Sequence, residues 1–214
     1  MKKLIYVPLL AVVFAVLPYG AKAETVSFAL MVNEASYGTL HRQSSNRGIP
    51  APEFARWLAG NVEGVSRGSG GGKVSAGELT VLRFDGRGNI TQQQTLTLRK
   101  SGGDKYPLPD RELMATMDRM FSNEVLFAYD AFFPQDVLIP GDTFFPGDTF
   151  VEGREEAVQA LSSGASEQMQ RATAGMDNPV GIALMLMPAE NQLQRGMRVA
   201  PATVLFVADS RRIR

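Results

Sequence analysis

Carboxylates are the most abundant groups in this chain that could do chemistry, because it has 22 acidic residues, one histidine and no cysteine. Two carboxylates can act as general acid and general base in hydrolysis when they converge in a cleft. Six of them have no role that the local pattern explains: Glu53, Glu63, Asp85, Asp104, Asp130 and Asp136. No spacing singles out two of these, so no catalytic residue is assigned. An extracytoplasmic carboxylate-dependent hydrolase is kept as an alternative function.

The shortage of histidine and cysteine excludes several other kinds of site. A single histidine cannot build a multi-histidine metal site. Without cysteine, the chain has no thiol nucleophile, cysteine-bound zinc, iron–sulfur cluster or haem attached through cysteine. A Ser-His-Asp triad would have to use His41, which lies in a polar segment and is interpreted as a surface residue. The sequence therefore predicts no cofactor.

The stretch from Asp85 to Asn89 has oxygen-bearing side chains beside glycines, as calcium loops do. Arg87 stands where a second oxygen ligand would be needed, and no bidentate glutamate follows at the right distance. The stretch is therefore interpreted as a tight turn, and no metal site is predicted.

The remaining candidate residues are aromatic. The segment 132–150 contains the sequence Pro-Gly-Asp-Thr-Phe twice, at 140–144 and 146–150. Each copy predicts a turn whose Phe returns to an apolar surface. The alternative is an exposed aromatic patch that docks a protein partner or an apolar ligand. The candidate binding residues are Phe132, Phe133, Phe144, Phe145 and Phe150, together with the single tryptophan, Trp57.

Residues 1–23 have the pattern of a secretory signal peptide, with two lysines at the start, an apolar run, and the small-x-small sequence Ala-Lys-Ala at 21–23. The apolar run is too short for a comfortable membrane span. We expect cleavage before Glu24 and a periplasmic or secreted bacterial protein with no stable membrane span. Removing the three lysines of this segment leaves 19 of the 22 basic residues against 22 acidic ones. A nucleic-acid partner is therefore not expected.

The clearest structural pattern is a hairpin over residues 79–98. Alternation with period 2 predicts that Ile90, Leu96 and Leu98 face a core while the threonines of the same strand face water. The first arm is apolar on both faces, which predicts a more central strand. The glycines of the turn between the arms tolerate positive φ, as tight hairpins require.

The rest of the chain predicts further elements around this hairpin. Strands are predicted at 25–33, 78–85, 89–99, 180–187 and 202–208. Helices are predicted at 51–60, at 111–121 with Asp110 as N-cap, and at 154–173 with a break at 162–164. The segment 33–48 is polar and is interpreted as irregular.

These elements predict one α+β domain over residues 24–214. Its core is an antiparallel, curved or partly closed β-sheet of five to seven strands with two or three packed helices, and 132–150 is an irregular Pro/Gly/Phe loop. The hairpin sequence Leu-Arg-Phe-Asp-Gly-Arg-Gly-Asn-Ile-Thr resembles a strand–turn–strand of small, exported, uncharacterised bacterial proteins of lipocalin- or avidin-like β-barrel type. The resemblance implies a barrel-like sheet and transfers no functional residue.

The expected function is that of an exported, soluble, non-enzymatic protein that binds a small apolar ligand or an envelope protein partner. Besides the hydrolase, a third hypothesis is a structural accessory of a secretion or surface assembly that docks through 132–150. An apolar pocket inside the sheet would favour ligand binding. Converging carboxylates with a raised pKa would favour the enzyme, and an exposed Phe patch would favour the assembly role.

Overall fold

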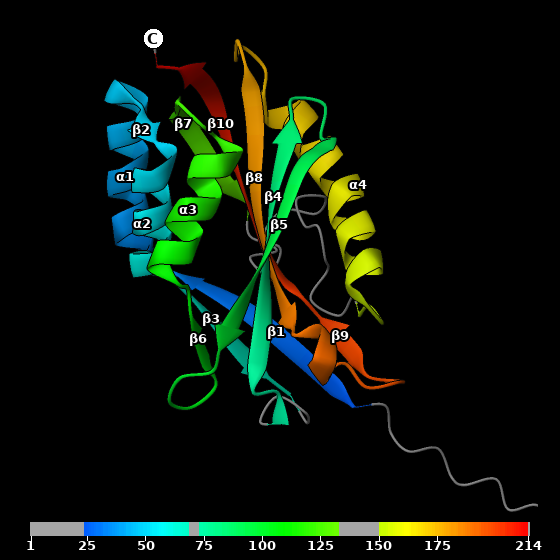
Figure 1. Cartoon of the computed structure of the whole chain (residues 1–214). Helices are drawn as coiled ribbons and strands as arrows, with labels where there is room; N and C mark the ends of the chain where they lie inside the picture. The colour runs from blue at the N-terminus through cyan, green and yellow to red at the C-terminus, as the bar shows by residue number, and fades with distance from the viewer. Residues whose placement is uncertain (1–23, 69–72, 133–149, 214) are drawn as a thin grey trace, which may run out of the picture.

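The computed structural model describes residues 24–68, 73–132 and 150–213. This part of the chain forms an α+β fold with two β-sheets and four α-helices (Figure 1). The helices are α1 (Glu34–Arg47), α2 (Ala51–Asn61), α3 (Asp110–Met120) and α4 (Arg154–Ala172), with a short 3-10 turn at Glu190–Gln192. None of the helices in the described ranges is long and apolar enough to cross a membrane.

The larger sheet has six strands, all antiparallel to their neighbours. Their order is β2 (Ile49–Pro50), β7 (Glu124–Phe132), β10 (Ala202–Arg212), β8 (Pro179–Pro188), β4 (Ala76–Asp85) and β5 (Ile90–Arg99). The smaller sheet has four strands in the order β6 (Lys105–Pro107), β3 (Val62–Arg67), β1 (Thr25–Val32) and β9 (Arg198–Ala200). Strands β1 and β9 are parallel, whereas the other pairs of the smaller sheet are antiparallel.

The two faces of the six-stranded sheet are covered by different elements, as Figure 1 shows. On one face, the ring of Phe206 in β10 lies 5.2 Å from the ring of Phe54 in α2. The four-stranded sheet covers the same face further along, where a Cβ on Gly64 would lie 2.2 Å from Leu186. On the opposite face, a Cβ on Gly181 would lie 2.9 Å from the sulfur of Met169 in α4. Glycine at these places allows the layers to approach closely.

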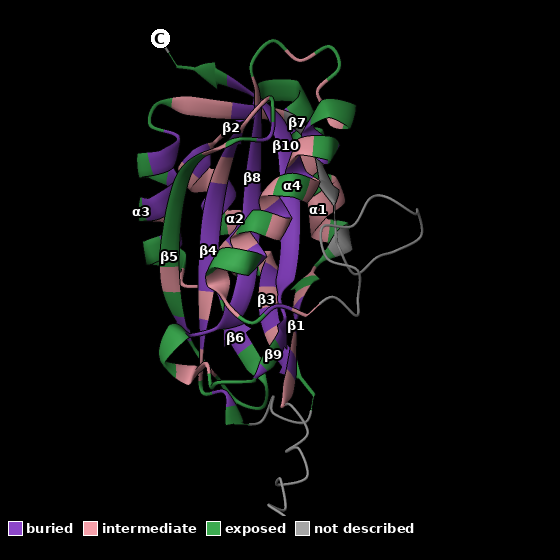
Figure 2. Ribbon diagram, turned by 90° about the vertical axis from the view of Figure 1, so that its right-hand side faces the viewer, coloured by how far each residue is buried: buried purple, intermediate pink, exposed green. Residues whose placement is uncertain are grey.

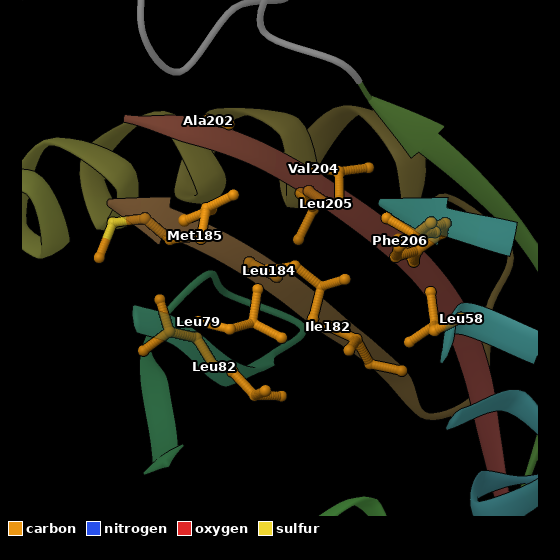
Figure 3. Packing of buried hydrophobic residues seen from close by; sticks show 14 of the residues in the cluster. Leu58, Leu79, Leu82, Ile182, Leu184, Met185, Ala202, Val204, Leu205 and Phe206 are labelled. Atoms are coloured by element: carbon orange, nitrogen blue, oxygen red, sulfur yellow. The ribbon is translucent and has the colours of Figure 1, made fainter. Parts of the chain in front are cut away.

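The core is centred on β8 and β10, which are buried over almost their whole length (Figure 2). Leu184 of β8 lies opposite Val204 of β10 (Figure 3). On its other side, Leu184 lies opposite Val81 of β4. Strands that are covered on both faces bury every side chain, so they have continuous apolar runs rather than alternation. Both strands are therefore detectable in the sequence from their apolar content alone, and they pair with each other as antiparallel neighbours.

The α+β class, the hairpin and the five predicted strands are confirmed, and the six strands of the larger sheet lie within the predicted five to seven. The described residues add a second sheet and a fourth helix to this prediction, and neither of their sheets closes into a barrel. Three strands of the smaller sheet, β3, β6 and β9, were missed. Asp110 is the first residue of α3, and the cap position belongs to Pro109.

Two predictions about helices are also wrong. Residues 34–47 form α1, although its polar sequence has no clear apolar stripe; the side chain of Asn33 caps it by accepting the amide of Ser36 at 3.1 Å. Helix α4 runs through Gly164 without a break. A glycine inside a helix costs about 1 kcal/mol relative to alanine. The buried Leu161 and Ala165 on either side hold this turn of α4 against the sheet.

The hairpin departs from its predicted alternation at one end. Gln92 lies opposite Arg83, but Ile90 lies opposite the next residue, Phe84, so the strand has a bulge at Thr91. The bulge turns Ile90 to the face that α4 covers. Leu96 and Leu98 remain on the other face, as predicted.

The turn of the hairpin is held by its own aspartate and by α4. Asp85 accepts hydrogen bonds from the amides of Arg87 and Asn89, both at 2.9 Å, and from the side chain of Asn89 at 3.0 Å. Gly88 has φ of +83°, and a Cβ there would lie 2.2 Å from Ser166 of α4. Partial burial raises the pKa of Asp85, but the hydrogen bonds from Asn89 and Arg87 lower it by more, so the net shift is downward.

We predict that Asp85→Asn lowers the stability of the protein at neutral pH. A carboxyl whose pKa is lower in the folded state stabilises the fold above its unfolded pKa, near 3.8, and this contribution disappears as the pH falls through the folded value. The difference in free energy of unfolding between variant and wild type should therefore shrink as the pH falls below 3.8. Denaturant unfolding over a pH series measures it. Asp118→Asn, on the exposed side of α3, is the control, and equal pH dependence of both variants would contradict the prediction.

Candidate functional site

A polar cleft with a volume of about 980 Å³ lies at the hairpin end of the six-stranded sheet. The hairpin turn, the end of α3, the first residue of β7 and the segment 177–180 form its walls. Seven charged residues line it, four of them arginines: Arg83, Arg87, Arg119, Arg212, Asp85, Glu124 and Asp177. Its volume is within the range of small-molecule sites. We call it the arginine cleft.

A nearly buried ion pair forms the base of the arginine cleft. The guanidinium of Arg83 in β4 contacts both carboxylate oxygens of Glu124 in β7, at 3.1 and 3.2 Å. The side chains are 18% and 10% exposed, respectively. Arg83 also donates to the carbonyl of Met120, and its guanidinium carbon lies 4.4 Å from the ring centre of Phe121. The hydroxyl of Ser210 in β10 donates to the same carboxylate. The pair therefore joins β4, β7, β10 and the end of α3.

The geometry of this pair explains how two charges can lie in the sheet. Removing an arginine and a carboxylate from water costs several kcal/mol per ion, and this cost is offset only when the hydrogen bonds of both groups are satisfied. A bidentate contact together with further hydrogen bonds meets that condition. Arg83 and Glu124 thus neutralise each other, so the net charge of the cleft is set by its other charged residues.

The other three arginines of the cleft lie on its exposed rim. Arg87, Arg119 and Arg212 form no ion pair within the described residues, although Arg119 donates to the hydroxyl of Thr116 at 3.3 Å. The two other acids in the cleft are Asp85, whose oxygens accept hydrogen bonds within the turn, and Asp177, so three cations stand against two anions. The rim therefore carries an excess of positive charge.

A second hollow of about 570 Å³ lies on the opposite face of the sheet, between β5 and α4. Ile90 and Val158 form its apolar part, and Gln93, Ser162 and Ser166 belong to its polar part. It exists because α4 packs over β8 and β10 and leaves β5 uncovered on this side. The bulge at Thr91 places Ile90 in this groove.

Trp57 does not line either hollow. It lies in α2, half-buried, with its ring stacked on Phe54 at 6.2 Å and tilted against Tyr37 of α1 at 6.2 Å. These contacts make it part of the packing between the two helices. Its assignment as a binding residue stays a prediction.

The predicted phenylalanines lie at the borders of 132–150 or outside the described residues. Phe132 ends β7, and Phe133, Phe144 and Phe145 fall outside the described ranges. Phe150 is half-exposed, and the guanidinium carbon of Arg198 lies 4.5 Å from its ring centre. The structure therefore does not bring the aromatic candidates together in a described site.

The sequence also contains one motif that could present a catalytic serine. Gly64-Val65-Ser66-Arg67-Gly68 has the G-x-S-x-G spacing of a nucleophile elbow, which requires a sharp strand-to-helix turn. Ser66 instead lies inside β3, opposite Phe28 of β1, with its hydroxyl buried and 3.5 Å from that of Tyr106. It is part of the packing between strands.

The residues of the arginine cleft were also missed, although one signal was present. Arg83 interrupts the apolar run Val81-Leu82-Arg83-Phe84 of a strand that was predicted to be central. A cation at such a position requires a buried partner. The sequence does not reveal that the partner is Glu124, or that Arg119 and Arg212 lie nearby.

Comparison with family models, curated proteins and solved structures finds no match for this chain. The resemblance of the hairpin to lipocalin- or avidin-like proteins stays a prediction. Function has to be argued from the geometry of the two hollows and the surface.

We predict that Glu124→Ala destabilises the protein by about 3–5 kcal/mol, because it leaves the Arg83 guanidinium buried without a counter-charge. The double variant Arg83→Met with Glu124→Leu should recover most of that loss, since it removes both charges. Denaturant unfolding measures both effects. Glu53→Ala breaks the exposed pair with Arg47 and should cost less than about 1 kcal/mol. If Glu124→Ala costs no more than this control, the ion pair does not hold the cleft together.

Proposed function

We propose that this protein is a non-enzymatic binding protein whose arginine cleft holds a small ligand with at least one acidic group. The observation that carries the proposal is the group of three exposed arginines around a cleft of about 980 Å³ whose own ion pair is already satisfied. Arginine suits this task because its planar guanidinium contacts a carboxylate or phosphate through two parallel hydrogen bonds.

The remainder of the cleft supports a ligand larger than a simple ion. Thr91 and Gln92 of β5, Ser122 after α3, and Asn178 before β8 line it with neutral hydrogen-bonding groups. Such groups orient a ligand once arginines have attracted its charge. The ion pair at the base fixes β4 against β7, which keeps the cleft preformed and reduces the entropy lost on binding.

Binding is favoured over hydrolysis by the state of the carboxylates in this cleft. Asp85 has its pKa lowered, whereas a general acid needs a pKa raised toward the working pH. The Glu124 carboxylate is occupied by Arg83 and Ser210. This leaves the extracytoplasmic hydrolase as the weaker hypothesis.

A second candidate keeps the apolar ligand that the sequence predicted. The space between the two sheets is filled by large buried side chains such as Phe28, Tyr106 and Leu186, so an apolar ligand would need another place. The groove between β5 and α4 has room for one, with Ile90 and Val158 as its apolar contacts. We rank it second because its lining brings no comparable group of charges or aromatic rings.

We predict that inorganic phosphate or citrate raises the melting temperature of the protein, because a ligand that binds only the folded state stabilises it. The double variant Arg119→Gln with Arg212→Gln should weaken binding by about tenfold or more, measured by titration calorimetry. The matched control is Arg56→Gln with Arg195→Gln, which removes two exposed arginines outside the cleft and should leave binding unchanged. Failure of both anions to bind, or equal loss in the control, would contradict the proposal.

We further propose that the protein is exported, on the pattern of residues 1–23. The prediction is that expression of the full gene in a bacterium yields protein in the periplasm or medium that begins at Glu24, as N-terminal sequencing would show. The variant Ala21→Lys with Ala23→Lys removes both small residues and should accumulate uncleaved. Cytoplasmic protein that retains residues 1–23 would contradict export.

A further inference from the structure

The two sheets together present four edges, and three of them are short or covered. Strand β2 has only two residues and ends in Pro50, which has no amide to donate. Strand β6 has three residues, with a lysine at its start and Pro107 at its end. Strand β9 also has three residues, and Val151 bridges its outer side through hydrogen bonds of 2.7 and 3.0 Å with Val199. These are the devices by which monomeric proteins prevent strands from pairing with other chains.

The fourth edge, β5, is built differently. It is ten residues long, and from Ile90 to Leu98 it contains no charged residue and no proline. Figure 2 shows it at the border of the six-stranded sheet, exposed over most of its length. Its one irregularity is the bulge at Thr91, near one end. No strand among the described residues pairs with its outer side.

The backbone groups that point outward from β5 can be identified from two hydrogen bonds. The amide of Lys100 donates to the carbonyl of Ser75 at 3.2 Å, so this pair bonds across the β4–β5 ladder. On the other side of β4, the amide of Ala189 donates to the carbonyl of Ala76 at 3.0 Å. In an antiparallel ladder, bonded and non-bonded pairs alternate.

This alternation assigns the direction of every backbone group in the regular part of β5. In β5, the amides and carbonyls of Leu98, Leu96 and Gln94 point to β4, because these residues lie opposite Gly77, Leu79 and Val81. Gln93, Thr95 and Thr97 therefore direct theirs away from the sheet. All three side chains are exposed as well. The outer side of β5 is a row of donors and acceptors that pair with no other strand of the described residues.

We propose that two copies of this chain associate by antiparallel pairing of β5 with β5, which joins two six-stranded sheets into one continuous sheet. A two-fold axis beside Thr95 places Thr95 opposite its own copy and Gln93 opposite Thr97 of the other copy. This register pairs Gln93, Thr95 and Thr97 and ends before the bulge at Thr91; Arg99, which also faces outward, lies beyond the paired residues. It also places Gln94 opposite Leu96, so the half-exposed leucine gains cover.

A second copy fits this edge better than a different protein. The side chains that meet are glutamine, threonine and leucine, so no like charges face each other across the axis. A strand with no charge between Ile90 and Leu98 also offers nothing to attract an oppositely charged partner. Amide and hydroxyl side chains both donate and accept hydrogen bonds, so they can pair with their own kind.

Sedimentation over a concentration series tests the association itself. Wild-type protein should show twice the monomer mass, and Thr95→Lys should weaken the dimer by about tenfold or more, because two lysines then face each other. Thr95→Glu should do the same, and an equal mixture of the two variants should form the dimer again. A wild-type protein that remains monomeric at every concentration, or a mixture that stays monomeric, would overturn the proposal.

Cross-linking tests the register. Because the chain has no native cysteine, a disulfide can form only between the introduced residues. A bonded antiparallel pair has its Cα atoms about 5.5 Å apart, within the range of roughly 4.4–6.8 Å that a disulfide spans. Thr95→Cys should therefore give a disulfide-linked dimer under mild oxidation. Thr97→Cys is the matched control on the same strand and face; its two copies would lie about 14 Å apart and should cross-link at least about tenfold more slowly. Equal rates for the two variants would overturn the pairing.

The association does not depend on the arginine cleft. Gln93, Thr95 and Thr97 lie outside the cleft lining, and the outward side of β5 carries the whole argument. Phosphate or citrate binding can be measured on the Thr95→Lys variant, so that failure of one proposal is distinguishable from failure of the other.

Discussion

The ion pair between Arg83 and Glu124 is the constraint on which the hairpin end of the fold depends. A cation inside the run Val81-Leu82-Arg83-Phe84, near the end of β4, must be neutralised where it lies, because the strand cannot turn it toward water without exposing its buried neighbours Leu82 and Phe84. Glu124 meets this need only if β7 begins directly after α3. The chain makes that possible with a sharp turn at Asn123, whose φ is +58° and whose carbonyl accepts the amide of Ile213 at 2.7 Å. One buried charge thus fixes the relative positions of β4, α3, β7 and the end of β10.

The arginine cleft follows from the same constraint. Because the pair holds the end of α3 close to β4, Arg119 is brought to the rim opposite the hairpin turn, while Arg212 reaches it from the last strand. These residues lie far apart in the sequence and have no shared pattern. Local periodicity predicts strands and helices because it records which face is buried, but it contains no information on which distant charges meet. This is why the hairpin could be predicted and the cleft could not.

The errors in the predicted fold have separate physical origins. Helix α1 was missed because most of its residues are polar, and its stability comes from the Asn33 cap and from burial of Leu40 against the sheet. Three strands of the smaller sheet were missed: β6 and β9 have only three residues each, and the buried face of β3 carries Gly64 and Ser66 beside Val62, which gives no apolar alternation. The break predicted in α4 overestimated the cost of placing Gly164 inside a helix. Packing of the buried Leu161 outweighs this propensity cost of about 1 kcal/mol. Ile90 was assigned to the wrong face because a bulge shifts the alternation, and bulges have no reliable signal in a single sequence.

The composition of β5 is best explained by a role beyond completing the sheet. A strand at an edge that only needed to stay soluble would carry lysine or proline, as β6 and β2 do. A strand that only needed to cover the core would carry apolar residues on its inner face throughout, but Gln92 and Gln94 stand there and are exposed. Neutral glutamine and threonine satisfy neither requirement well. They do suit a strand that must be soluble alone and still accept a copy of itself, because their hydrogen bonds can go to water or to an identical side chain. The choice of residues at the edge therefore argues for pairing independently of the backbone groups that point outward.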